Sequence, residues 1–140
     1  MIAIEFNNRT KYNFPKSAVL NALNNANNVL RVKKKQILSV AFVGSTEMKK
    51  INKQYRRKNK ATDVLSFKVE ASDCTGEIII CPAQAKKQAK EFGQSYKKEI
   101  VKLALHGYLH LQGFDHEKEV EAMEMERLEL KILTGAVNNT

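Results

Sequence analysis

All three histidines of this 140-residue chain lie within eleven residues, at positions 106, 110 and 116. His106 and His110 are four residues apart, which on a helix places both imidazoles on one face, one turn apart. Gly113 follows, and glycine readily takes the left-handed backbone that ends a helix. The chain can then turn so that His116 approaches the other two. Three imidazoles grouped in this way predict a divalent-metal site with an open fourth position, as in catalytic zinc sites.

The spacing of these residues matches the zinc motif of the metzincin proteases, His-Glu-x-x-His-x-x-Gly-x-x-His, at every ligand position. The proteases have a glutamate general base after the first histidine, whereas this chain has Gly107. The pattern therefore predicts a metal site without the peptidase base. Histidines that merely satisfy hydrogen bonds are the alternative, which fits a lone histidine better than a cluster.

A basic segment between residues 49 and 60 is the second group suited to chemistry. Seven of its twelve residues are lysine or arginine, and Tyr55 lies among them. Such segments bind phosphates by releasing counterions, although a solvated face without a partner is the alternative. The wider charge distribution supports a polyanionic partner, because residues 1–69 carry 15 Lys/Arg against 3 Asp/Glu, whereas residues 70–140 carry 9 against 12.

Length and composition favour one domain spanning residues 1–140, which the metal site would make catalytic. A chain of this size buries about two-thirds of its unfolded surface without disulfides. Its 43% hydrophobic and 28% charged residues are typical of a soluble globular protein. With no signal peptide and no apolar run of transmembrane length, we expect a cytoplasmic protein with no membrane partner. Cys74 and Cys81 are therefore expected to be free thiols with no disulfide partner.

The elements that position these residues follow from hydrophobic periodicity. Strands are predicted at 2–6, 37–43, 62–69 and 76–81, with a short polar loop at 70–75. Helices are predicted at 15–30, from 45 or 46 onward, from 82 to 93, at 96–112 and at 117–133. This order predicts an α+β fold, with a mixed four-stranded sheet, helices packed over it and the metal site at the end of the central helix.

The central helix, residues 96–112, is apolar on most sides, and the two histidines lie on its one polar stripe. Ser95 is its predicted N-cap. For the helix that precedes the basic segment, Ser45 or Thr46 is the predicted cap, and Tyr55 is predicted to face inward.

Two stretches of the sequence resemble the signatures of the YbeY endoribonucleases, which are bacterial rRNA maturation factors. Residues 55–67, Tyr-Arg-Arg-Lys-Asn-Lys-Ala-Thr-Asp-Val-Leu-Ser-Phe, look like the first signature. Residues 106–116, His-Gly-Tyr-Leu-His-Leu-Gln-Gly-Phe-Asp-His, are similar to the second. Ala61 and Lys68 stand where the family usually has proline, and Glu77 where it has aspartate. These departures lie outside the ligand set, and the resemblance covers nearly the whole chain.

The resemblance implies one Zn²⁺ ion held by His106, His110 and His116, and cleavage of single-stranded RNA. It also implies maturation of the 16S rRNA 3′ end and quality control of ribosomes, so small-subunit rRNA and the ribosome are the expected partners. Arg56 matches the family's functional arginine and is the expected catalytic residue. With RNA as substrate, the expected RNA-binding residues are Lys49, Lys50, Lys53, Arg57, Lys58 and Lys60.

Asp115 is the carboxylate next to the predicted ligands, and it could orient a ligand histidine or cap the last helix. Two alternatives for the function remain open. A zinc metallohydrolase acting on another substrate, including peptides, is disfavoured by the glycine at position 107. A non-catalytic ribosome-assembly factor with structural zinc is disfavoured by the open fourth position of the metal.

Overall fold

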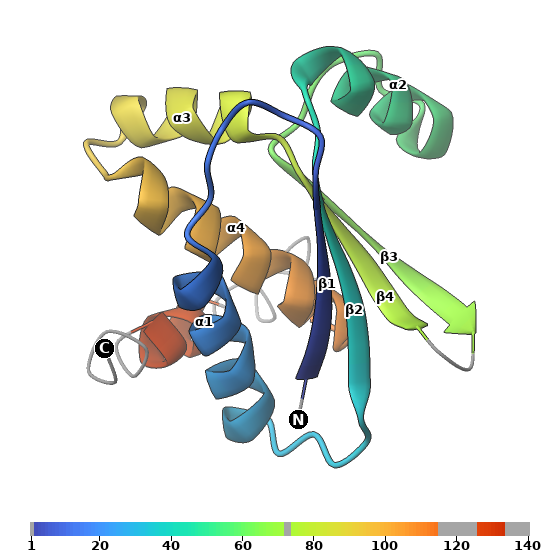
Figure 1. Cartoon of the computed structure of the whole chain (residues 1–140), viewed down its shortest axis with the longest axis vertical. Coiled ribbons are helices and arrows are strands. Elements are labelled where there is room, and N and C mark those ends of the chain that lie inside the picture. The colour runs from blue at the N-terminus through green and yellow to red at the C-terminus, as the bar shows by residue number, and fades with distance from the viewer. Residues whose placement is uncertain (1, 72–73, 115–125, 134–140) are drawn as a thin grey trace.

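The computed structural model describes residues 2–71, 74–114 and 126–133 (Figure 1). Its elements are, in order, β1 (Ile2–Asn8), α1 (Lys16–Val29), β2 (Gln36–Phe42), α2 (Ser45–Arg56), β3 (Val64–Ala71), β4 (Cys74–Ile80), α3 (Pro82–Glu91) and α4 (Tyr96–Leu111). Residues 126–133 form a further helix. This order agrees with the predicted one, although the first part of the predicted helix 117–133 lies outside the described residues. None of the helices in these ranges is both long and apolar enough to cross a membrane.

A four-stranded sheet in the order β1-β2-β4-β3 forms the centre of the fold. β1 pairs with β2 and β2 with β4 in parallel, whereas β3 pairs with β4 antiparallel. Parallel neighbours need a long crossover, which α1 provides between β1 and β2. The predicted α+β class with a mixed four-stranded sheet is therefore confirmed.

Alternate residues of β2 and β4 point to opposite faces of the sheet and form two apolar clusters. Figure 1 shows α1, α3 and α4 on one side of the sheet and α2 on the other. The larger cluster, on the side of α1 and α4, includes Val40, Phe42, Ile78 and Ile80. The smaller, on the side of α2, includes Ala41, Val43, Met48, Leu65, Ile79 and Cys81. Since both faces are covered, most of the described residues of the two inner strands are buried.

The helices α1 and α4 are joined by a buried hydrogen bond between side chains. The Tyr108 hydroxyl donates to Asn27 Oδ1 at 3.0 Å, and both residues are buried. Burial raises the pKa of Tyr108 to about 12, so the phenol keeps its proton and remains a donor. This contact fixes the rotation of α4, and with it the direction of the histidines on its opposite stripe.

Two predictions about local structure are wrong. The polar loop predicted at 70–75 is largely strand, because β3 continues to Ala71, which pairs with Cys74 of β4. A strand ladder uses backbone groups, so polar side chains do not end it. The N-cap of α2 is Gly44, in extended conformation and without a side-chain cap, rather than Ser45 or Thr46.

Other local predictions are confirmed. Ser95 caps α4, since its hydroxyl accepts a hydrogen bond from the backbone N–H of Lys98 at 3.1 Å. Gly113 follows α4 with a φ of 101°, the left-handed region that glycine tolerates. Separately, Cys81 is buried in the smaller apolar cluster.

Candidate metal centre and adjoining pocket

His106 and His110 lie on successive turns at the end of α4, and their ring nitrogens meet. The two Nε2 atoms are 3.2 Å apart, with ring centroids separated by 4.7 Å. Zinc–nitrogen bonds of about 2.0–2.1 Å in a tetrahedral site place two ligand nitrogens about 3.3–3.4 Å apart. The pair therefore fits one shared divalent ion without rearrangement of the helix.

Glu129, from the helix at 126–133, fixes the orientation of one of these rings. Its Oε1 lies 3.1 Å from His106 Nδ1, and the side chains are only 12% and 28% exposed, respectively. An ionised carboxylate is only an acceptor, so Nδ1 carries the proton and Nε2 presents its lone pair toward His110. This is the carboxylate–histidine arrangement that orients ligands in zinc proteins.

Sequence reasoning missed Glu129 and suggested Asp115 for this role. Asp115 and the third predicted ligand, His116, both lie outside the described residues. Within the ranges that are described, no group of three or more His, Cys, Asp or Glu is placed to hold a metal ion. The structure therefore places two of the predicted ligands together. It also places beside them the carboxylate of Glu129, which is 23 residues after His106 in the sequence.

Gly107, the residue that departs from the protease motif, has a packing reason to be small. A Cβ at this position would lie 2.8 Å from Cγ2 and 3.3 Å from Cγ1 of Ile78 on β4. These distances are shorter than ordinary van der Waals contact, so α4 can approach the sheet only with glycine here. A glutamate side chain would be directed into the sheet rather than toward the histidine pair.

A cavity of about 680 Å³ adjoins the histidine pair along the outer edge of β3. It is lined by residues 62–67 and by side chains of α3 and α4, including Glu99, His106 and His110. Arg56, the expected catalytic residue, also lines it from the end of α2. The structure thus brings Arg56 and the histidine pair to one pocket, although they are 50 residues apart in the sequence. Pockets of this size accept small organic ligands.

The remaining predicted RNA contacts do not line this pocket. All six are exposed, with Lys49, Lys50 and Lys53 on α2 and the others beyond its end. Arg57 is the C-cap of α2, in left-handed conformation with a φ of 57°. The segment after it is held by Asn52, whose side-chain amide donates to the carbonyl of Lys60 at 2.9 Å.

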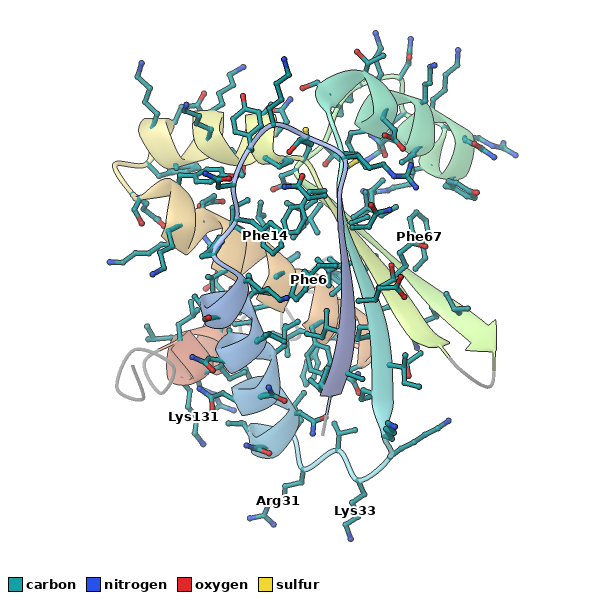
Figure 2. The ribbon with its side chains drawn as sticks, in the orientation of Figure 1. Phe6, Phe14, Arg31, Lys33, Phe67 and Lys131 are labelled. Atoms are coloured by element: carbon teal, nitrogen blue, oxygen red, sulfur yellow. The ribbon has the colours of Figure 1, made fainter. Side chains whose placement is uncertain are left out.

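Tyr55 is not inward-facing as predicted, because 61% of it is exposed. Its ring lies on that of Phe67, with centroids 5.1 Å apart. Figure 2 shows Phe67 projecting from the sheet beneath α2, and Phe67 also lines the pocket. The pair forms an aromatic surface beside Arg56.

A buried carboxyl, that of Glu99, also lines the pocket. Only 4% of Glu99 is exposed, and burial is the main cause that raises its pKa above 4.5. The nearby charge of Asp63 raises the pKa further, whereas Lys102 lowers it. Sequence reasoning did not single out Glu99, although its position seven residues before His106, on the same face of one helix, was a usable signal.

Known proteins resemble this chain over most of its length. A family model described as "Endoribonuclease YbeY" matches residues 4–136. The "Endoribonuclease YbeY" of Nautilia profundicola is 43% identical over 129 residues, which cover 91% of this chain and 88% of that protein. The protein of the same name from Staphylococcus carnosus is 46% identical over 98 residues, covering 63% and 64%. The chain therefore spans somewhat less than two-thirds of that relative's length.

A solved structure also resembles the fold. The solution structure of TM1509 from Thermotoga maritima has a TM-score of 0.67 and 27% sequence identity, and the match covers 99% of this chain and 91% of that one. The similarity extends from β1 to the C-terminal helix, so the sheet and the helix that carries the histidines belong to one shared architecture.

Proposed function

Since the chain belongs to the YbeY family of endoribonucleases, we propose that it cleaves single-stranded RNA in a metal-dependent reaction. The ion is Zn²⁺, held by His106, His110 and His116. The substrate is small-subunit rRNA, at the 3′ end of 16S rRNA and on defective ribosomes. The protein acts in the cytoplasm, with residues 1–140 working as one catalytic domain.

One observation carries the proposal: Arg56 and the histidine pair line the same pocket, and the two Nε2 atoms are 3.2 Å apart. When bound, the ion supplies positive charge that polarises a phosphoryl oxygen. Arg56 donates from its planar guanidinium to two non-bridging oxygens of the scissile phosphate, where negative charge grows in the transition state. Glu129 holds the His106 ring so that Nε2 faces the ion.

The surroundings of Arg56 suit a single strand better than a duplex. Unpaired bases stack on aromatic rings, and Tyr55 and Phe67 present such rings beside the pocket. The exposed lysines of α2 neutralise flanking phosphates. Residues 66–67 of β3 line the pocket, where they hold the sugar–phosphate chain.

The proposal is tested by turnover of a labelled single-stranded RNA. The purified protein should cut the RNA, lose activity in excess chelator and recover it with added zinc. Cleavage of peptides but not RNA would instead favour another hydrolase. Zinc that is retained without any turnover would favour the structural role in ribosome assembly.

A further inference from the structure

Glu99 is the one acidic side chain of the described residues that is buried in the pocket with an oxygen left unpaired. It is 4% exposed, and none of the described residues hydrogen-bonds to Oε2. A buried acceptor without a partner costs about 1–3 kcal/mol, and more when it is charged. A protein core has no use for such a group, so its presence in a pocket calls for a partner that arrives from solution.

Neither of the neighbouring charges provides that partner. Lys102 lies one turn further along α4 and is exposed, and it forms no ion pair with Glu99 among the described residues. Asp63 is a second acidic group, and its Oδ1 already accepts from the backbone N–H of Val64 at 2.7 Å. Two carboxyl groups facing one space favour a ligand that brings hydrogen-bond donors.

The position of Glu99 separates it from the scissile phosphate. It is seven residues before His106, about 10 Å away along the helix axis at 1.5 Å per residue. Side chains on a helix all lean toward its N-terminus, so Glu99 and the histidines lean the same way and this separation is kept. Glu99 and the histidine pair therefore cannot contact the same phosphate. A nucleotide bound next to the cleaved bond would place its base at this end of the pocket.

An aromatic ring also lines this pocket. Phe92, at the C-cap of α3, lines the pocket and is 69% exposed, which is unusual for a large apolar side chain. A free ring at the mouth of a pocket is a suitable surface for a nucleobase to stack on.

We propose that Glu99 and Phe92 form a guanine-binding subsite, in which the Glu99 carboxylate accepts hydrogen bonds from the guanine N1–H and 2-amino groups while Phe92 stacks on the base. Guanine is the base whose Watson–Crick edge presents two adjacent donors, which match the two oxygens of one carboxylate. Adenine, cytosine and uracil each present an acceptor beside a donor, and that acceptor would face the carboxylate oxygen. The inference rests on the proposed function, because it assigns the subsite to an RNA strand.

The test uses the zinc-loaded full chain and two single-stranded RNAs that differ at one position. One carries a single guanosine in a uridine strand, and the other carries inosine there, which lacks only the 2-amino group. Single-turnover cleavage should be about 10-fold to 100-fold faster for the guanosine strand, the effect of one hydrogen bond to a charged acceptor. Glu99→Gln should abolish this ratio. Glu5→Gln, which makes the same charge change on exposed β1, should preserve it.

A second measurement keeps the inference separate from the proposed function. Equilibrium binding of guanosine 5′-monophosphate and inosine 5′-monophosphate needs no cleavage. The wild type should bind the guanosine nucleotide more tightly, Glu99→Gln should bind both alike, and Phe92→Ala should weaken both equally. If the wild type binds both nucleotides alike, or Glu99→Gln keeps the preference, the subsite is overturned whatever the cleavage assay gives. Failure to cleave any RNA, with the nucleotide preference intact, would overturn the proposed function alone.

Discussion

At the scale of single residues, Glu129 shows how a carboxylate can orient a proposed ligand histidine. Its carboxylate holds His106 Nδ1 at 3.1 Å, so the proton is fixed on the nitrogen that faces away from His110. Removing it should free the ring to rotate and exchange tautomers. We expect Glu129→Ala to bind zinc about 10-fold to 100-fold more weakly, as for other carboxylates behind a ligand histidine.

Competition with a chromophoric chelator measures this affinity directly. Glu126→Ala, at an exposed position on the same helix, is the control and should bind zinc like the wild type. Glu129→Gln keeps an acceptor, so its zinc affinity should lie between those of Glu129→Ala and Glu126→Ala. Equal affinity of all four proteins would remove Glu129 from the metal centre.

Arg56 and Arg57 are adjacent in sequence but occupy different positions in the structure. Arg56 lines the pocket, whereas Arg57 ends α2 in left-handed conformation. If Arg56 stabilises the transition state, Arg56→Ala should lower single-turnover kcat by about 10²–10³ at saturating protein. Arg56→Lys should not restore the rate, because an ammonium cannot form the bidentate contact. Arg57→Ala should lower kcat much less than Arg56→Ala does. A rate close to wild type for Arg56→Ala, with zinc content intact, would reduce Arg56 to one more basic contact.

We expect Glu99 to affect the stability of the protein as well as its binding of nucleotides. Its pKa is raised above 4.5 in the folded protein by burial and by Asp63, against the opposing effect of Lys102. The folded state therefore holds the proton more tightly than the unfolded state. The resulting stabilisation is fully present below the ordinary pKa of a glutamate. It is lost as the pH rises through the raised pKa of Glu99 in the folded protein. Glutamine has no proton to lose, so Glu99→Gln should gain stability relative to the wild type as pH rises through that window.

Urea denaturation at a series of pH values measures the difference in the free energy of unfolding. Glu5→Gln, with the same loss of charge at an exposed position, should show no such pH dependence. A difference between Glu99→Gln and the wild type that stays constant with pH would mean that Glu99 is equally exposed to solvent in both states.

At the scale of elements, the site depends on how closely α4 approaches β4. Gly107 allows this approach, since a Cβ there would lie 2.8 Å from Ile78 Cγ2. Gly107→Ala gains about 0.5–1 kcal/mol of helix propensity, but overpacking costs about 1–3 kcal/mol. We expect a net loss of about 1 kcal/mol in urea denaturation, together with weaker zinc binding as the helix is displaced.

A double-mutant cycle identifies the cause. Ile78→Ala removes the methyl group that the new Cβ would meet, so Gly107→Ala should cost less in that background. If the losses of stability from Gly107→Ala and Ile78→Ala simply add, the contact between the new Cβ and Ile78 is not the cause of the destabilisation.

The sequence predicted the elements well because most carry a regular period and clear terminal residues. Ser95 and Gly113 are examples, and both occupy the predicted positions at the ends of α4. The errors came where tertiary contacts determine the orientation of a side chain or the end of a strand. Tyr55 faces outward because Phe67 offers it a ring across the sheet edge, and Ala71 is strand because Cys74 pairs with it.

The same limit applies to the site. The spacing of His106 and His110 is a property of one helix, so their pairing followed from sequence alone. Glu129 and Glu99 became recognisable only in three dimensions, because the first approaches from a separate helix and the second is defined by its burial.

At the scale of the whole molecule, the basic surface should determine affinity for RNA. Each phosphate neutralised on a single strand contributes about 0.7 to the slope of log K against log salt. Replacing Lys49, Lys50 and Lys53 together by glutamine should weaken binding and reduce that slope by up to about 2. Filter binding of single-stranded RNA across a salt series gives the value.

A matched control exists at the far end of the molecule. Lys33, Lys34 and Lys35 are exposed in the segment between α1 and β2, and Figure 2 shows Lys33 at the opposite end from α2. Changing these three to glutamine removes the same charge. If both triple variants alter the slope equally, affinity follows net charge rather than the surface of α2.

The separation of Glu129 from His106 along the sequence also affects folding during synthesis. Every strand of the sheet and both histidines of α4 precede Glu129 in the chain, and 23 residues separate the carboxylate from its ring. At a synthesis rate of about 5–20 residues per second, a nascent chain would expose the histidine pair about one to five seconds before the carboxylate follows. Zinc captured in that interval would be held loosely, and its release would slow only when the last helix docks.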